Sequence, residues 1–118
     1  MKPNQQGITY ALDIIRPKWN VEIIILLSDG TKRYNEIKSA IKDINAKVLT
    51  ESLQLLEKSG IIYRKQYPVF PRRVEYSLTA SGRDIEPLLI FLNDWGIEHH
   101  SRHNEIMQES PFSGLDFM

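Results

Sequence analysis

An amphipathic helix followed directly by two strands is the feature that most constrains the fold of this chain. Residues 46–59 carry apolar side chains at helical spacing, and Asn45 before them belongs to the residue types that cap helix N-termini. Gly60 stands where a C-terminal cap glycine belongs. Residues 61–67 and 73–78 then read as strands, the second with strict alternation of apolar and polar side chains. A five-residue connection predicts that the two strands form a hairpin.

A shorter helix precedes this one and is joined to it by only a few residues. Its apolar face is expected to hold Tyr34, Ile37, Ile41 and Ile44. The inward stripe of the following helix is expected to hold Ala46, Leu49, Leu53 and Leu56. Two short helices with so tight a connection form a helix-turn-helix candidate, at about 34–59. A helix-turn-helix followed directly by a hairpin, here about 61–78, predicts a winged helix whose wing is the hairpin.

Further helices are predicted on both sides of this unit. The first covers residues 8–15 and is interrupted by Pro17, so that Asn20 is expected to cap a second helix. Thr79 is expected to cap a last helix over about 80–108. We therefore predict a mainly α fold with a small β-hairpin (α+β), in which residues 1–118 form a single winged helix domain with flanking N- and C-terminal helices.

Charge is distributed unevenly along a chain whose formal net charge is zero. Residues 31–83 hold eleven basic and five acidic side chains, a formal +6, so the remainder carries −6. A basic middle between acidic ends suggests a face for a polyanion, although a solvated surface without a partner would give the same count. The chain has no cysteine and no apolar run of membrane-spanning length, and its N-terminus does not read as a signal peptide. We expect a cytoplasmic protein.

Several spaced motifs resemble the HxlR-type bacterial transcriptional regulators, a branch near the MarR group. They are Lys18-Trp19, Leu27 with Gly30, the segment Arg33, Tyr34, Glu36 and Ile37, the helix pattern Leu49, Leu53, Leu56 and Gly60, and the closing "VEYSLT". The resemblance runs from about Asp13 to Trp95 and implies a homodimeric, sequence-specific DNA-binding transcriptional regulator, which we expect to be a repressor. Many members carry a sensor cysteine near the position of Gly7, and this chain has none.

The winged helix places the second helix of the helix-turn-helix in the major groove and the wing on the backbone or the adjacent minor groove. Gln54 can read adenine, Thr50 can contact phosphate or a thymine methyl, and Glu51 can accept from cytosine. Arg72 is the stronger candidate of the two wing arginines, since Arg73 already begins a strand. The candidate DNA contacts are Lys32, Arg33, Asn45, Lys47, Val48, Thr50, Glu51, Gln54, Lys58, Arg72 and Arg73. The operator is expected to be a palindrome in double-stranded DNA.

The flanking helices present more apolar surface than so small a domain can bury alone. The predicted dimer interface consists of Ile8, Leu12, Leu88, Leu92 and Trp95. Trp19 is interpreted as a core residue. For Phe70, at the tip of the wing, three positions stay open: facing DNA, folded against its own hairpin, or packed on the partner subunit.

Sequence features of other functions are weak. His99 and His103 are four residues apart on a helix, but a polar helix end explains them better than a metal site, because no cysteine is present and a structural zinc site usually has four ligands. No catalytic constellation or phosphate-binding loop stands out, so we expect neither an enzyme nor a cofactor. A winged-helix module for protein–protein contact is the alternative, and the polar outer face of residues 46–59 argues against it. A small-molecule effector is possible.

Overall fold

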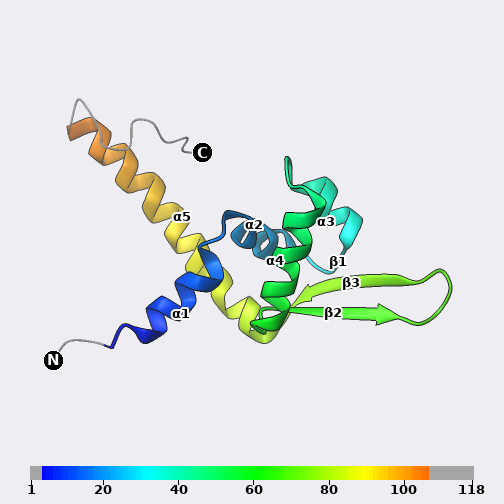
Figure 1. Cartoon of the computed structure of the whole chain (residues 1–118). Coiled ribbons are helices and arrows are strands. Elements are labelled where there is room, and N and C mark those ends of the chain that lie inside the picture. Colours follow the sequence, from blue (N-terminus) through cyan, green and yellow to red (C-terminus); the bar gives the residue numbers. More distant parts are fainter. Residues whose placement is uncertain (1–3, 107–118) are drawn as a thin grey trace. The chain divides into compact units, whose positions relative to one another are not determined.

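The computed structural model of the chain describes residues 4–106 (Figure 1). The elements in chain order are α1 (Gln6–Ile15), α2 (Lys18–Leu27), β1 (Lys32–Arg33), α3 (Tyr34–Ala40), α4 (Ala46–Lys58), β2 (Ile62–Tyr67), β3 (Arg73–Leu78) and α5 (Ala80–Ile106). The prediction of a mainly helical fold with a small antiparallel sheet is confirmed. The chain divides into two compact units between Glu86 and Pro87, inside α5. The first unit contains the helix-turn-helix and the sheet, and the second contains the rest of α5.

The helix-turn-helix consists of α3 and α4. As predicted, the Asn45 side chain caps α4, because its amide oxygen accepts a hydrogen bond of 2.8 Å from the Val48 N–H. The turn before it contains Asp43 with a positive φ of 69°, a conformation that aspartate tolerates better than most residues. The α3 helix ends at Ala40, earlier than the apolar pattern suggested. Ile41 and Ile44 are buried, but they belong to the turn between α3 and α4.

The inward stripe of α4 is confirmed at three of its four positions. Leu49, Leu53 and Leu56 are buried, whereas Ala46 is exposed. The prediction for Ala46 was wrong: this residue is the first of the helix, and the buried side chains of α4 begin at Leu49. At the other end, Gly60 has a φ of 75°, which glycine adopts without steric cost.

The end of α4 leads the chain directly into the wing. The Ile61 N–H donates to the Leu56 carbonyl at 2.9 Å, and the Gly60 N–H donates to the Glu57 carbonyl at 3.0 Å. This pair of bonds is the Schellman motif, and it satisfies carbonyls that a helix terminus leaves without a partner. Since β2 begins at Ile62, the motif sets the direction in which the hairpin leaves α4.

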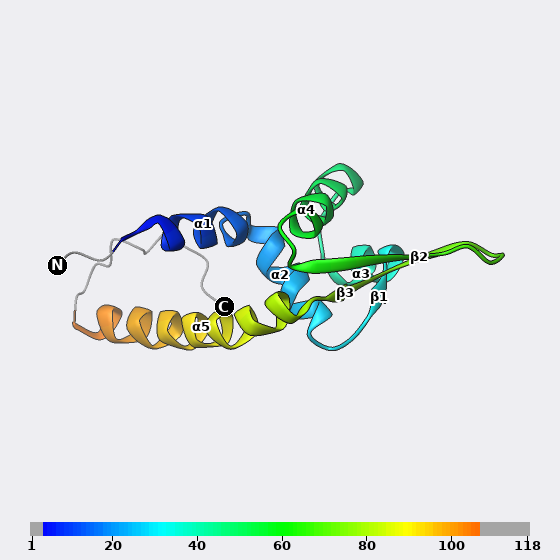
Figure 2. The same cartoon turned by 90° about the horizontal axis from the view of Figure 1, so that it is seen from below.

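The hairpin belongs to a three-stranded antiparallel sheet with strand order β1-β3-β2. Ile62 pairs with Leu78 at one end of the β2–β3 ladder, and Tyr67 pairs with Arg73 at the other. Both views show the two strands side by side, with their connecting loop carried well away from α4 (Figures 1 and 2). β1 was not predicted, because its two residues are too few to show a period and form a strand only through pairing with β3.

Thr79 connects the end of the wing to the start of α5. As predicted it caps α5: its hydroxyl oxygen accepts from the Gly82 N–H at 3.1 Å. The same hydroxyl donates to the Gly60 carbonyl at 2.6 Å, which ties the start of α5 to the end of α4. A Cβ on Gly82 would collide with the carbonyl oxygen of Ile61 and lie 3.0 Å from a methyl carbon of Leu78. Glycine at this position therefore permits close packing of α5 on the base of the hairpin.

Asn20 does not cap α2, and that prediction was wrong. The helix begins at Lys18 with Pro17 at the cap position, because the fixed φ of proline suits the start of a helix. Asn20 consequently lies inside α2, fully buried, and its side-chain amide donates to the Ile14 carbonyl at 2.7 Å. The carbonyl belongs to the end of α1, so a buried side chain joins the first two helices.

The core of the first unit lies between α2, α3, α4 and the base of the sheet. Its fully or almost fully buried side chains include Ile23, Ile24, Leu27, Ile37, Leu49, Leu53, Leu56 and Ile62. Trp19, interpreted as a core residue, is half-buried, with the Lys18 ammonium 4.9 Å from its ring centroid. Because α4 packs through one apolar stripe, its opposite face stays exposed to solvent.

Candidate nucleic-acid interface

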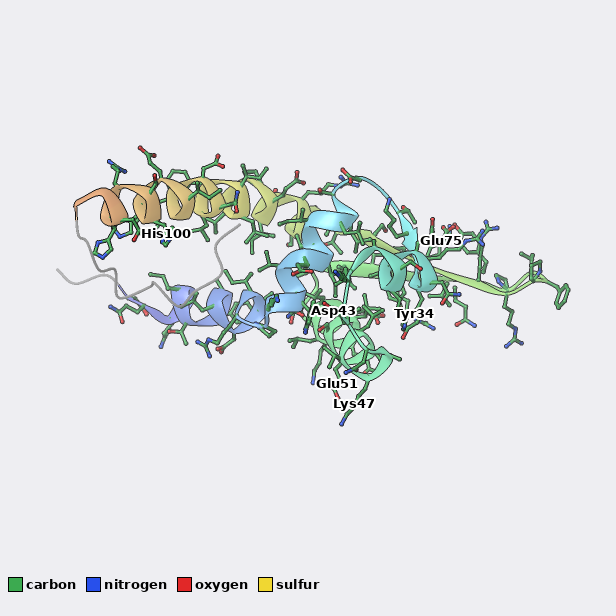
Figure 3. All side chains as sticks on the ribbon, turned by 90° about the horizontal axis from the view of Figure 1, so that it is seen from above. Tyr34, Asp43, Lys47, Glu51, Glu75 and His100 are labelled. Carbon is green, nitrogen blue, oxygen red and sulfur yellow. The ribbon has the colours of Figure 1, made fainter. Side chains whose placement is uncertain are left out.

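The face of α4 opposite its buried leucines is polar and exposed. It carries Lys47, Thr50, Glu51, Gln54 and Lys58, all of them exposed to solvent. Figure 3 shows Lys47 and Glu51 pointing outward from the helix. Two further predicted contacts are less available: the Asn45 oxygen caps the helix, and the Val48 side chain is half-buried. Such a face offers hydrogen-bond donors and acceptors on side chains that can reach base edges.

A cleft lies where α3, α4 and the sheet meet. Its volume is about 350 Å³, and it is lined by Tyr34, Thr50, Leu53, Gln54, Glu57, Arg64 and Tyr76. Thr50 and Gln54, predicted as DNA contacts, therefore stand on the cleft wall that α4 supplies. Arg64 enters the same cleft from β2, and it was not among the predicted site residues.

Arg64 is exposed, and among the side chains that the structure describes it makes no ion pair. The alternation of the strand contained the signal for it. Ile62 and Arg64 are two residues apart on β2, so both point to the face of the sheet that contacts α4. A cation beside the polar face of α4 adds to the positive charge that this region offers to a polyanion.

The predicted contacts Arg33 and Arg73 lie on the other face of the sheet. Arg33 pairs with Glu75 across β1 and β3, and Lys65 pairs with the same glutamate across β2 and β3. Figure 3 places Glu75 on the side of the sheet away from Lys47 and Glu51. Lys32, on β1, pairs with Tyr76 and is half-buried. The structure thus does not bring all the predicted basic residues to one surface.

The two wing arginines differ in what holds them. Arg73 stacks its guanidinium on the Tyr67 ring, 4.1 Å from the ring centroid, and lies 3.6 Å from a carboxylate oxygen of Glu75. The Lys65 ammonium lies 4.8 Å from the same ring centroid. Arg72 is in the loop between the strands and is exposed. Arg73 therefore stiffens the stem of the wing, and Arg72 is available at its tip.

The residues predicted for a dimer interface are exposed in their own units. Ile8 and Leu12 of α1 are 60% and 43% exposed. On α5, Leu88, Leu92 and Trp95 recur at helical spacing and are likewise exposed. The Trp95 ring stacks on His99 with centroids 4.9 Å apart, and His99 in turn stacks on His103 at 5.9 Å. Within the described part of the chain, no cluster of three or more His, Cys, Asp or Glu residues could hold a metal ion.

Known proteins resemble this chain over most of its length. The HxlR-like helix-turn-helix family matches residues 14–104. YdeP of Bacillus subtilis (strain 168), an uncharacterized HTH-type transcriptional regulator, is 40% identical over 95 residues, which cover 80% of this chain and 74% of YdeP.

Solved structures share the fold. A protein assigned to the MarR family of transcriptional regulators, from Enterococcus faecalis V583, superposes with a TM-score of 0.79 at 33% identity, over 89% of this chain and 96% of that one. The redox regulator HypR in its reduced form superposes with a TM-score of 0.74 at 36% identity, over 80% of this chain and 94% of HypR. The present chain contains no cysteine.

These relatives are regulators and not enzymes, in agreement with the sequence analysis. No helix within residues 4–106 is long and apolar enough to cross a membrane. A capped polar helix, a wing directly after it, and a match of residues 14–104 agree with one another. The chain belongs to the HxlR-like helix-turn-helix family of DNA-binding transcriptional regulators.

Proposed function

We propose that this protein is a cytoplasmic homodimeric repressor that places α4 in the major groove of a palindromic operator. The observation that carries the proposal is the exposed polar face of α4, which a side-chain cap and the Schellman motif hold between the turn and the wing. Thr50 and Gln54 read base edges from this face, while Lys47 and Lys58 contact phosphates. A bound dimer represses by covering promoter DNA that RNA polymerase needs.

Arg72 is proposed to supply the wing's principal contact with DNA. Its side chain is exposed in the loop, whereas Arg73 is engaged with Tyr67 and Glu75. A narrow minor groove concentrates negative potential, and an arginine at the end of a stiff hairpin suits it. Arg64, in the cleft beside α4, is proposed as a further backbone contact on the same side as Thr50.

Arg72→Ala is expected to weaken operator binding and its dependence on salt. Each arginine that neutralises a phosphate releases counterions, so the slope of log affinity against log salt should become shallower by about one per subunit. The slope is measured by fluorescence anisotropy of labelled operator DNA over a series of salt concentrations. The operator is first located by footprinting on DNA upstream of the genes beside the protein's own.

Arg83→Ala is the matched control, because Arg83 is also exposed and its loss removes the same charge from the first unit. Its slope should equal that of the wild type. If the wild-type protein binds every DNA with a flat salt slope, DNA binding through this surface is wrong and the protein-contact alternative gains support. If Arg72→Ala alone leaves the slope unchanged, the wing contact is wrong and the α4 contacts stand.

The dimer is proposed to form through the apolar faces of α1 and α5. Leu92→Glu is expected to convert a dimer into a monomer, because a buried interface would have to desolvate the new carboxylate. Analytical ultracentrifugation at micromolar protein concentration reports the mass directly. Operator affinity should fall in the same variant, since two half-sites are no longer bound together.

Ile97→Glu is the control for this change. Leu92 and Ile97 are exposed to nearly the same extent, 44% and 45%, and both are in α5. Helical spacing puts Ile97 on the side of α5 opposite Leu88, Leu92 and Trp95. The proposed interface predicts that Ile97→Glu stays dimeric. A monomeric wild type, or equal dissociation of both variants, would rule it out.

A further inference from the structure

Phe70 is exposed to solvent to an unusual degree. Its side chain is 97% exposed, and the next most exposed large apolar side chain among the described residues, Phe91, is 63% exposed. Val69 beside it is 60% exposed. An aromatic ring in this position gains nothing from burial when the chain folds. The structure also answers one of the open alternatives, because Phe70 does not pack against its own hairpin.

The wing presents this ring on a stiff support. The last paired residues of the hairpin are Tyr67 and Arg73, and the guanidinium of Arg73 covers the Tyr67 ring. Pro68 and Pro71 flank Val69 and Phe70, and their rings restrict the backbone of the loop. Figures 1 and 2 show the loop at the far end of the hairpin, away from α4. A side chain held in this way loses little conformational freedom when it meets a partner.

Charge around the tip selects the class of that partner. Residues 61–78 contain four cationic side chains, Arg64, Lys65, Arg72 and Arg73, against the single acid Glu75. A hydrophobic tip surrounded by cations is complementary to a polyanion that has an apolar interior. Duplex DNA has that character: phosphates line its grooves, and its stacked bases form the interior.

We propose that Phe70 is a wedge that enters the minor groove and inserts between two adjacent base pairs, kinking the operator. The proposal rests on the DNA binding proposed above and adds a deformation to it. Phenylalanine has no hydrogen-bonding group, so it reads no base edge; what it can do is replace part of the stacking between neighbouring pairs. Arg72, next to the tip, holds the wing on the phosphates while the ring inserts.

The wedge gives the wing a preference for sequence without base contacts. Pyrimidine–purine steps such as TA unstack at the lowest cost, so operators should carry a flexible step where each wing lies. Specificity at these positions would then arise from the energy of deforming the DNA.

The experiment measures DNA bending and unstacking separately from affinity. Operator fragments carry a fluorophore at each end, so that energy transfer between the ends reports the bend. A second set carries a fluorescent adenine analogue at the TA step under the wing, which brightens when it is unstacked. Wild-type protein is expected to shorten the end-to-end distance and brighten the analogue. Phe70→Ala is expected to abolish the brightening and reduce the bend, with affinity lowered roughly tenfold.

Two variants serve as controls. Phe70→Leu keeps an apolar wedge and should retain most of the bend. Val69→Ala truncates the neighbouring apolar side chain of the same loop and should leave the brightening in place. Circular dichroism and the footprint of α4 check that each variant folds and binds the same site; neither should change, because the fully exposed ring contributes nothing to the core.

The outcomes separate the wedge from the function on which it rests. If the wild-type protein binds its operator with the expected salt slope but leaves the fluorescence of the analogue unchanged, the wedge is overturned and DNA binding stands. Equal bending by wild-type protein and Phe70→Ala also overturns it. If Phe70→Ala instead changes the sedimenting mass, the ring belongs to a protein interface and the wedge is wrong. Absence of any DNA binding would refute the proposed function itself.

Discussion

Replacing Thr50 and Gln54 together by alanine should lower affinity for the operator by roughly 100-fold or more, while binding to unrelated DNA changes little. Each well-placed contact to a base edge discriminates by about 1–3 kcal/mol, and this variant removes two. Lys47, Lys58 and Arg72 keep their charges in this variant, so the electrostatic attraction to phosphates persists. Competition between labelled operator and unlabelled random duplex, at one fixed salt concentration, measures the ratio of the two affinities.

The fold should tolerate this change because both side chains are exposed on α4 and alanine is a good helix former. Leu55→Ala is the control within the same helix: Leu55 is exposed and lies outside the polar face. Its operator preference should match that of the wild type. A double variant that still prefers its operator would remove α4 as the reading helix and shift attention to the wing.

Asn20→Asp should destabilise the protein by about 3 kcal/mol or more at neutral pH. Asn20 is fully buried and donates its amide hydrogen to the Ile14 carbonyl. An ionised aspartate has no hydrogen to donate, so the carbonyl loses its partner and a carboxylate is buried beside it. The free energy of unfolding, taken from urea titrations of both proteins, measures the loss.

The stability lost by Asn20→Asp relative to the wild type should increase as pH rises. Burial raises the folded-state pKa of the new carboxyl above its value of about 3.9 in the unfolded chain. Below that unfolded pKa the group is protonated in both states, and the variant comes closest to the wild type. As pH rises from there through the folded-state pKa, stability is lost, and it then stays constant. The comparison uses wild type at each pH, because other carboxyls titrate too.

Asn35→Asp provides the contrast for this variant. Asn35 is exposed in the first turn of α3, where an acidic side chain interacts favourably with the helix dipole. It makes the same chemical change without burial, so its stability should equal or slightly exceed that of the wild type at neutral pH. A small effect of Asn20→Asp without pH dependence would mean that water reaches the end of α1.

Local signals along the chain were enough to predict α4 and its ends. Asn45, Gly60 and Thr79 each act on backbone groups within a few residues of themselves, so their roles follow from neighbouring sequence. The hairpin followed from the alternation of residues 73–78. The order of these elements predicted the winged helix, and the family match agrees with it.

Failures occurred where packing between separate elements decided the outcome. Asn20 looked like a cap because its type favours helix starts, but its bond to Ile14 exists only when α1 and α2 pack. β1 is a strand only beside β3. Arg33 and Arg73 were predicted to share a surface with the other basic contacts. Arg33 is instead the strand partner of Glu75, and Arg73 lies beside the same carboxylate, so both are on the far face of the sheet.

Local signals in the sequence predict the order of the helices and the hairpin, and where α4 and α5 begin, because caps and hydrophobic periods act over one or two turns of chain. Which side chains share a surface depends on how the elements pack: Arg64 lines one cleft with Thr50 and Gln54, Arg33 lies away from that cleft, and Phe70 is exposed at the tip of the wing. A strand alternates its side chains between its two faces, and only packing against α4 decides which of those faces meets that helix.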